Sequence, residues 1–250
     1  MAKIILFANG PAGLEVARFL STSNDDIYRI YYVDDETYKH DLLGIQNIDK
    51  STLFSWQDFK EPDHLRLLLN EPSDFMITVY WPYLLRGEEL YIAKDSVNFH
   101  PAFLPVNRGW YPHVHSILDG SATGVTLHRI SQGADTGDIW VQEKVDLLST
   151  DIASDIYLRL QEHIIDLFKK NWQEIHTGVI IPFPQNEKHA IYRKKSEIDK
   201  LDFIDLETKT TARKLINLLR SRTFGNKGFA YFIDEFGNKI KISISLKKEE

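Results

Sequence analysis

The sequence predicts an α/β fold with a mostly parallel, Rossmann-like sheet, followed by a small carboxyl-terminal region with a helix and a β-hairpin. Apolar runs of strand length alternate with helical patterns in the first part of the chain, which is typical of a sheet covered by helices. The opening is the clearest unit, because the mostly apolar residues 3–8 favour a buried strand and Gly10, Pro11 and Gly13 provide a turn before an amphipathic helix. Further strands are expected at 28–33, 75–80 and 97–100, with helices around 64–69 and 110–118.

The pattern changes in the second half of the chain. Two strands are expected at residues 124–129 and 139–145, joined by a polar loop at 131–138. A long helix should follow, because apolar residues recur every four positions from Ile152 to Trp172.

The carboxyl-terminal region is separated from the rest by a predicted linker. Two prolines within residues 182–187 favour such a linker, which predicts a large domain over 1–184 and a small α+β region over 185–250. The small region should contain a helix at 210–220 and a hairpin formed by 228–234 and 239–246.

Composition excludes several classes of function. The 250 residues contain no cysteine, which rules out a disulfide framework, a thiolate zinc site and a thiol nucleophile. The formal net charge is -6 with both signs interspersed, so a long nucleic acid is not an expected partner. The amino-terminal apolar run is too short for a signal peptide or a membrane span. We therefore expect a cytoplasmic protein that does not bind membranes.

The first glycine-rich turn could hold a phosphate. Glycines between a strand and a helix let a pyrophosphate approach the helix amino terminus, so Asn9 and Gly10 are candidate substrate contacts. The full dinucleotide fingerprint needs a third glycine, and Asp34 or Asp35 adds little support. A simple tight turn, or a nicotinamide-dependent oxidoreductase, remains an alternative interpretation.

The segment N-F-H-P-A-F-L-P is more specific. If residues 97–100 form a strand, Asn98 and His100 point to the same face, and Pro101 ends the strand where ligands bind in open α/β sheets. The loop S-Q-G-A-D-T-G-D carries a third polar group, Asp135, among glycines. The remaining histidines singled out are interpreted as structural residues: His113, His115 and His128.

An amide, an imidazole and a carboxylate suit acyl transfer to an amine. The amine must lose a proton, the attacked carbonyl becomes an oxyanion, and the leaving nitrogen must gain a proton. Each residue type meets one of these needs, and none requires a metal.

Three segments in fixed order resemble the formyltransferases that use 10-formyltetrahydrofolate: N-F-H-P-A-F-L-P, T-G-V-T-L-H and D-T-G-D-I. The resemblance covers about residues 3–178. The continuation N-R-G-W-Y-P is similar to the sugar N-formyltransferases of that family. The chain lacks the phosphate loop of the glycinamide ribonucleotide enzymes and the large basic domain of the methionyl-tRNA enzymes.

The resemblance implies roles for individual residues. The catalytic residues would be Asn98, His100 and Asp135. The co-substrate 10-formyltetrahydrofolate would contact Pro82, Tyr83, Leu84, Ile130, Gly133 and Asp138. The nucleotide sugar would contact Arg108 and also Arg222 and Phe224, although the segment that carries these two could equally be a helix end with a basic cap. Asn9 and Gly10 are candidate contacts from the first glycine turn, and Trp81 and Tyr111 from their proximity to these segments.

The same resemblance implies an acceptor and an assembly. The expected acceptor is dTDP-4-amino-4,6-dideoxyglucose, used for bacterial lipopolysaccharide (O-antigen) synthesis, with a dTDP-3-amino-3,6-dideoxy sugar as the alternative. A homodimer formed through the carboxyl-terminal hairpin is expected. A noncatalytic nucleotide-binding protein on the same sheet is the alternative from another class.

Overall fold

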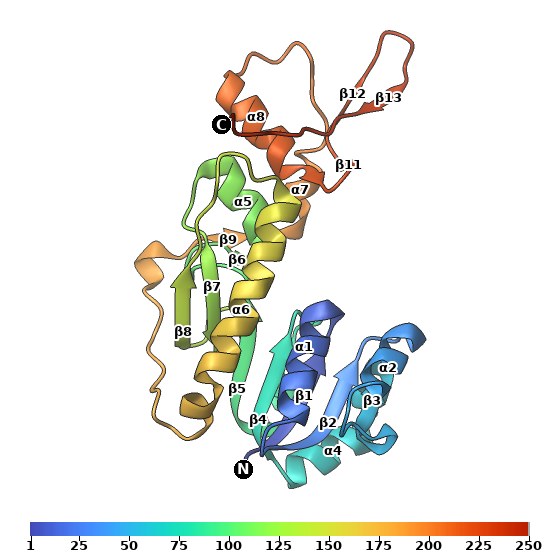
Figure 1. Ribbon diagram of the computed structural model, residues 1–250, viewed down its shortest axis with the longest axis vertical. Coiled ribbons are helices and arrows are strands. Elements are labelled where there is room, and N and C mark those ends of the chain that lie inside the picture. Colours follow the sequence, from blue (N-terminus) through green and yellow to red (C-terminus); the bar gives the residue numbers. More distant parts are fainter. Residues whose placement is uncertain (250) are drawn as a thin grey trace. The chain divides into compact units, whose positions relative to one another are not determined.

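The computed structural model describes residues 1–249 and contains a seven-stranded sheet (Figure 1). The strand order is β3-β2-β1-β4-β5-β7-β8. The pairs from β3 to β5 are parallel, whereas β5 and β7 are antiparallel, so the predicted mostly parallel α/β sheet is confirmed. The strands are β1 (Lys3–Ala8), β2 (Asp26–Tyr32), β3 (Leu53–Ser55), β4 (Ser73–Val79), β5 (Ala93–His100), β7 (Gly124–His128) and β8 (Ile139–Lys144).

Helices connect the strands, and within residues 1–249 six further short strands lie outside the sheet. The helices are α1 (Gly10–Ser21), α2 (Glu36–Leu43), α3 (Trp56–Lys60), α4 (Pro62–Asn70), α5 (Pro112–Asp119), α6 (Ala153–His176), α7 (Lys195–Asp199) and α8 (Ala212–Ser221). The short strands are β6 (Arg108–Gly109), β9 (Tyr192–Arg193), β10 (Thr223–Phe224), β11 (Lys227–Gly228), β12 (Tyr231–Ile233) and β13 (Lys239–Lys241). None of the helices among residues 1–249 has the length and apolar character that a membrane span requires.

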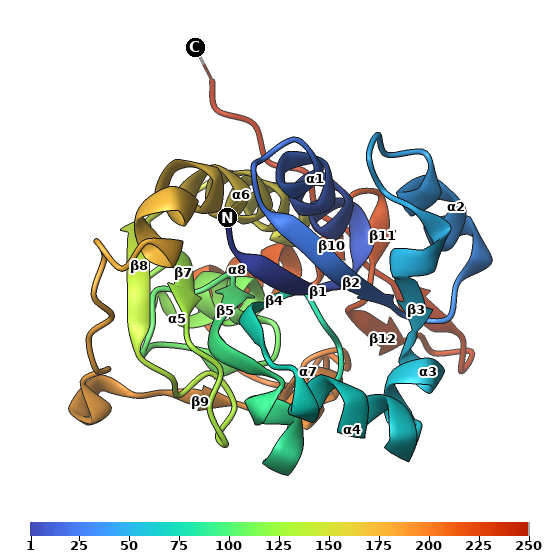
Figure 2. The same cartoon turned by 90° about the horizontal axis from the view of Figure 1, so that it is seen from below.

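Strand β1 is buried on both faces, which explains its continuous apolar run. Ile5 and Phe7 belong to a core cluster that includes Trp56 and Phe59 of α3. Figure 2 shows α1 on one side of the sheet and α4 on the other. The alternation of the strand therefore divides its side chains between two apolar layers.

The chain forms two compact units. The first comprises Met1–His100, Thr126–Val141 and Ile164–Gln185. The second comprises Pro101–Val125, Gln142–His163 and the residues from Asn186 onward. The predicted division between 1–184 and 185–250 remains a prediction.

Two predicted boundaries in the second unit are corrected. Helix α5 begins at Pro112 and not at Trp110, because Tyr111 has a left-handed backbone (φ 54°) and a residue before proline disfavours the helical region. The hairpin predicted near the carboxyl terminus is confirmed but shorter, with Tyr231 opposite Lys241 and Ile233 opposite Lys239.

The segment predicted as a linker, residues 182–187, is attached to the sheet edge in its first half. Phe183 exchanges two backbone hydrogen bonds with Ile139 of β8, at 2.8 and 2.9 Å. The prolines indicated irregular structure correctly, but proline is compatible with an edge position next to a strand. This attachment fixes the position of Gln185, which contacts the loop described below.

Candidate active site

Three polar side chains form a row across three adjacent strands of the first unit. The parallel register of β4 and β5 places Thr78 opposite Asn98, and the antiparallel register of β5 and β7 places His128 opposite Asn98. Side chains of directly opposed residues lie on the same face of a sheet, so the three groups meet. Thr78 and His128 are both 2% exposed.

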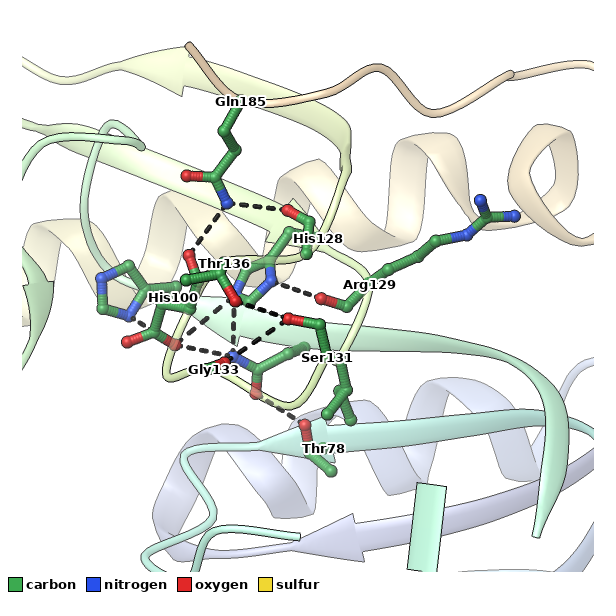
Figure 3. Close-up of polar contacts among 12 residues, drawn as sticks. Thr78, His100, His128, Arg129, Ser131, Gly133, Thr136 and Gln185 are labelled. Atoms are coloured by element: carbon green, nitrogen blue, oxygen red, sulfur yellow. Dashed lines mark hydrogen bonds and ion pairs between the residues drawn. The ribbon is translucent and has the colours of Figure 1, made fainter. Parts of the chain in front are cut away.

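Asn98 is hydrogen-bonded along this row (Figure 3). The Thr78 hydroxyl donates to Asn98 Oδ1 at 2.6 Å, and Asn98 Nδ2 donates to His128 Nε2 at 2.9 Å. A third, longer contact of 3.4 Å joins Asn98 Nδ2 to the Asp135 carboxylate. The other side of β5 is apolar, because Phe99 packs against Phe168 of α6 with ring centroids 5.0 Å apart. Asn98 and His100 therefore share the polar face, as the alternation of the strand predicts.

Asp135 brings a carboxylate to both histidines of this face. Its Oδ1 atom lies 3.6 Å from His100 Nδ1 and 3.6 Å from His128 Nε2. The side chains are mostly shielded from solvent, at 6% exposure for His100 and 16% for Asp135. Asp135 has a left-handed backbone (φ 55°), a conformation that aspartate and asparagine tolerate better than most residues. The expected convergence of Asn98, His100 and Asp135 is thus present in the structure.

The loop that carries Asp135 is held by contacts of its own. Gln185 Nε2 donates to the carbonyl oxygens of Asp135 at 2.9 Å and Gly137 at 2.7 Å, from the opposite side to Thr78 in Figure 3. The hydroxyls of Ser131 and Thr136 are 2.6 Å apart. A Cβ at Gly137 would lie 1.8 Å from the Arg129 carbonyl oxygen, so only glycine fits there.

A pocket opens beside this row. Most of the predicted folate contacts line it, namely Tyr83, Leu84, Ile130 and Gly133, together with Asn98 and Asp135. The pocket is also lined by Thr78, Trp81, Leu85, His128 and Ser131. Pro82 and Asp138 are not among its lining residues, and the Asp138 carboxylate instead lies 3.8 Å from Arg129.

Trp81 lies among the expected folate contacts. Its ring packs edge-on against Phe7, Trp56 and Tyr83, with centroids 5.2 to 5.8 Å apart. Its Nε1 donor is buried and has no hydrogen-bond partner among residues 1–249. An aromatic wall of this kind can stack on a flat heterocycle.

Asn9 and Gly10 lie at the carboxyl end of β1 and do not line the pocket. Asn9 Nδ2 donates to the Tyr80 carbonyl at 2.8 Å and so supports the start of the loop that carries Trp81. The Gly10 carbonyl accepts a hydrogen bond from Tyr38 at 3.1 Å. A phosphate contact at this turn remains a prediction.

The other predicted substrate contacts belong to the second unit. Arg108 is fully buried, and its guanidinium donates to both Glu187 oxygens, at 2.6 and 3.0 Å, and to the Tyr192 hydroxyl at 3.0 Å. Arg222 is bonded to Asp202 at 2.5 Å. These contacts favour a structural role for Arg108, whereas a substrate contact at Arg222 remains a prediction.

An aromatic row also lies in the second unit. Neighbouring ring centroids are 5.3 to 6.3 Å apart along Tyr111, His113, Tyr157 and Phe224. Burial, with smaller contributions from His115 and Arg222, lowers the pKa of His113 to about 4. His113 is therefore neutral near pH 7.

Two residues of the site were missed by the sequence interpretation. His128 was interpreted as structural, but it lines the pocket and contacts Asn98. Thr78 was not singled out, although its hydroxyl reaches the same amide. Their places depend on strand register, which a single sequence does not reveal. The motif T-G-V-T-L-H, which overlaps the strand predicted at 124–129, was the available signal for His128.

This chain is similar in sequence and fold to known formyltransferases. The curated dTDP-4-amino-4,6-dideoxyglucose formyltransferase of Mycobacterium bovis is 33% identical over 155 residues, which span 62% of this chain and 65% of that protein. The crystal structure of a 4-N formyltransferase from Francisella tularensis matches with a TM-score of 0.87 at 24% identity, over 99% of each chain. A formyltransferase from Anoxybacillus kamchatkensis, in complex with UDP-4,6-dideoxy-4-formamido-L-AltNAc and tetrahydrofolate, matches at 28% identity with a TM-score of 0.59, over 79% of this chain and 88% of that one.

Two family models match this sequence. The N-formyltransferase dimerization C-terminal domain matches residues 197–248. The Formyl transferase model matches residues 34–169, which is more than half of the 250 residues. The resemblance found in the three motifs is therefore confirmed, and this chain belongs to the formyl transferase family.

Proposed function

We propose that this protein transfers a formyl group from 10-formyltetrahydrofolate to the amino group of a nucleotide-linked sugar. The observation that carries the proposal is the meeting of Asn98, His100 and Asp135, with the Asn98 amide 3.4 Å and the His100 ring 3.6 Å from the Asp135 carboxylate. Asn98 and Asp135 line a pocket with aromatic and apolar walls.

Each group has one task in the proposed reaction. Asp135 accepts a proton from the amine as the new carbon–nitrogen bond forms. Asn98 donates a hydrogen bond to the formyl oxygen as this oxygen gains negative charge. His100 in its charged form stabilises the negative charge on the same oxygen. His100 then returns a proton to the departing nitrogen when the old carbon–nitrogen bond breaks. No metal is required for these steps.

The pocket residues fit a folate. Trp81, Tyr83 and Leu84 offer a flat apolar surface, and the buried Trp81 Nε1 is a donor in need of an acceptor. Bound there, 10-formyltetrahydrofolate supplies the one-carbon unit. The relative crystallised with tetrahydrofolate supports this assignment. Pro82 and Asp138 are proposed to act through their loops and not as pocket walls.

The proposed acceptor is dTDP-4-amino-4,6-dideoxyglucose. The curated relative at 33% identity is named for this substrate, and the structural relative from Francisella is a 4-N formyltransferase. The aromatic row from Tyr111 to Phe224 offers flat surfaces for a nucleobase, and we retain Tyr111, Arg222 and Phe224 as proposed nucleotide contacts. A dTDP-3-amino-3,6-dideoxy sugar is the alternative acceptor.

The wider role follows from that acceptor. A formylated dideoxy sugar would enter lipopolysaccharide O-antigen synthesis in the cytoplasm. We also propose a homodimer formed through the carboxyl-terminal hairpin, supported by the match to a dimerization domain at residues 197–248.

A mass-spectrometric screen tests the proposal. The protein is incubated with 10-formyltetrahydrofolate and a panel of dTDP-3-amino and dTDP-4-amino sugars, and products are examined for the added mass of one carbonyl. We expect formylation of the 4-amino sugar, dependent on both substrates. Formylation of a 3-amino sugar alone would move the acceptor to the alternative. Binding of folate and sugar without turnover would refute the enzyme assignment and favour a noncatalytic binding protein.

A further inference from the structure

The Asn98 amide is held at both ends by side chains of neighbouring strands. Thr78 bonds to its oxygen and His128 to its nitrogen, and the three residues are in register across β4, β5 and β7. Both partners are almost fully buried. Water therefore competes little with either bond.

The direction of each hydrogen bond follows from one backbone carbonyl. His128 Nδ1 lies 2.7 Å from the Arg129 carbonyl oxygen, which can only accept, so Nδ1 carries the proton. In the neutral ring Nε2 is then an acceptor, which agrees with the Asn98 Nδ2 atom that lies 2.9 Å away. The Asn98 oxygen consequently faces Thr78, whose hydroxyl must donate.

The lengths of the three Asn98 hydrogen bonds distinguish the two that hold the amide from the one that a substrate can replace. The bonds to Thr78 and His128, at 2.6 and 2.9 Å, have normal lengths for strong hydrogen bonds. The contact to Asp135, at 3.4 Å, is long and correspondingly weak. The second N–H of Asn98 is therefore the one that a substrate oxygen can capture at little cost.

We propose that Thr78 and His128 are positioning residues that fix the orientation of the Asn98 amide, so that its second N–H is presented to the formyl oxygen. This inference rests on the proposed formyl transfer. Without the Thr78 hydroxyl, the Asn98 oxygen loses its donor in a partly buried site, and the amide rotates toward other partners. The transition-state hydrogen bond then weakens, while the walls that bind the folate stay in place.

The test replaces Thr78 with valine, which keeps the shape, and with serine, which keeps the hydroxyl. Losing this partly buried neutral hydrogen bond corresponds to a kcat decrease of roughly tenfold to a hundredfold in Thr78→Val. Both KM values should stay within about threefold, and Thr78→Ser should recover most of the kcat. Ser73→Ala is the matched control, because Ser73 is a buried residue of the same strand whose hydroxyl has no hydrogen-bond partner among residues 1–249.

A double substitution asks whether Thr78 acts through Asn98. In an Asn98→Ala background, Thr78→Val should lower kcat no further, because the amide it orients is gone. An unchanged kcat in Thr78→Val, equal losses in the valine and serine variants, or a further loss in the Asn98→Ala background would each overturn the proposal.

A second measurement addresses the case in which a variant folds poorly. It also separates this inference from the proposed function. The side-chain NH2 signals of Asn98 in 15N-labelled protein, assigned by their loss in Asn98→Ala, should move in Thr78→Val and not in Ser73→Ala. If the unmodified protein formylates no amino sugar, the proposed function fails, and the NMR result alone decides whether the amide is held. If the signals do not move, the positioning role fails whatever the activity.

Discussion

Replacing Asp135 with asparagine removes the proposed base while preserving the shape of the loop. Asp135 has φ 55°, and asparagine is among the few residues that adopt this conformation at low cost. The new side chain keeps an oxygen for Asn98 and the same volume. Any large effect on turnover can therefore be assigned to the lost charge and proton acceptor.

The size of the effect follows from the distance to His100. At an effective dielectric constant of about 20, a carboxylate 3.6 Å from an imidazolium stabilises it by roughly 4–5 kcal/mol. Since about 1.4 kcal/mol corresponds to a factor of ten, this is about a thousandfold. General-base catalysis typically contributes 10²- to 10⁴-fold, which brackets the same value. We expect kcat of Asp135→Asn to fall about a thousandfold.

The assay measures formylated nucleotide sugar by mass spectrometry, with folate binding followed by tryptophan fluorescence, because Trp81 lines the pocket. Folate affinity and the thermal midpoint should change little. Asp63→Asn provides the control for charge removal, since its side chain is 92% exposed on α4. If Asp135→Asn kept a tenth or more of the kcat, Asp135 would not be the base.

Three further outcomes are expected in the second unit. Arg220→Met should lower the thermal midpoint by about 10 °C in a melting experiment. The buried guanidinium donates to two backbone carbonyls at 2.6 and 2.8 Å, and each such hydrogen bond contributes about 1.5–3 kcal/mol. An unchanged midpoint would contradict this. Arg108→Met should lower the melting temperature and leave the sugar KM unchanged, since Glu187 already occupies the guanidinium; a raised KM at constant stability would instead make Arg108 a substrate contact. The pKa of His113 is lowered from 6.5 to about 4 in the folded protein, so between pH 4 and pH 6.5 its ring binds a proton mainly in the unfolded state. The free energy of unfolding should therefore fall by about 3 kcal/mol as the pH drops from 7 to 4. In denaturant titrations at both pH values, His113→Phe should lose this part of the acid sensitivity, and an identical dependence in both proteins would argue against it.

The parts of the site that were predictable depend on local pattern. The alternation of β5 places Asn98 and His100 on one face, and glycines around Asp135 indicate a tight loop, so the three groups could be identified without coordinates. The end of α5 at Gly120 is similarly local, because a glycine at φ 71° ends a helix.

The parts that were not predictable depend on pairing between distant segments. Thr78 and His128 reach Asn98 only because two strand registers coincide at one row. Gln185 lies in a segment whose prolines favour a linker, yet its amide holds the loop of Asp135. Glu187, distant in sequence, is a partner of Arg108 that the sequence did not indicate, and the expected substrate contact of Arg108 stays a prediction.

The antiparallel direction of β7 explains why the Asp135 loop needs so many supports. His128 pairs with Asn98 while Thr126 pairs with His100, so β7 runs away from the carboxyl end of β5. The chain must then turn back to bring Asp135 within 3.6 Å of His100. Three features stabilise the loop where the chain turns back: the left-handed backbone at Asp135, the close backbone approach at Gly137 and the two hydrogen bonds from Gln185. The loop thus positions Asp135, the base of the proposed reaction, whereas the sheet positions Asn98, the proposed oxyanion donor. Substitutions in the loop and substitutions in the sheet should therefore have distinguishable effects on kcat.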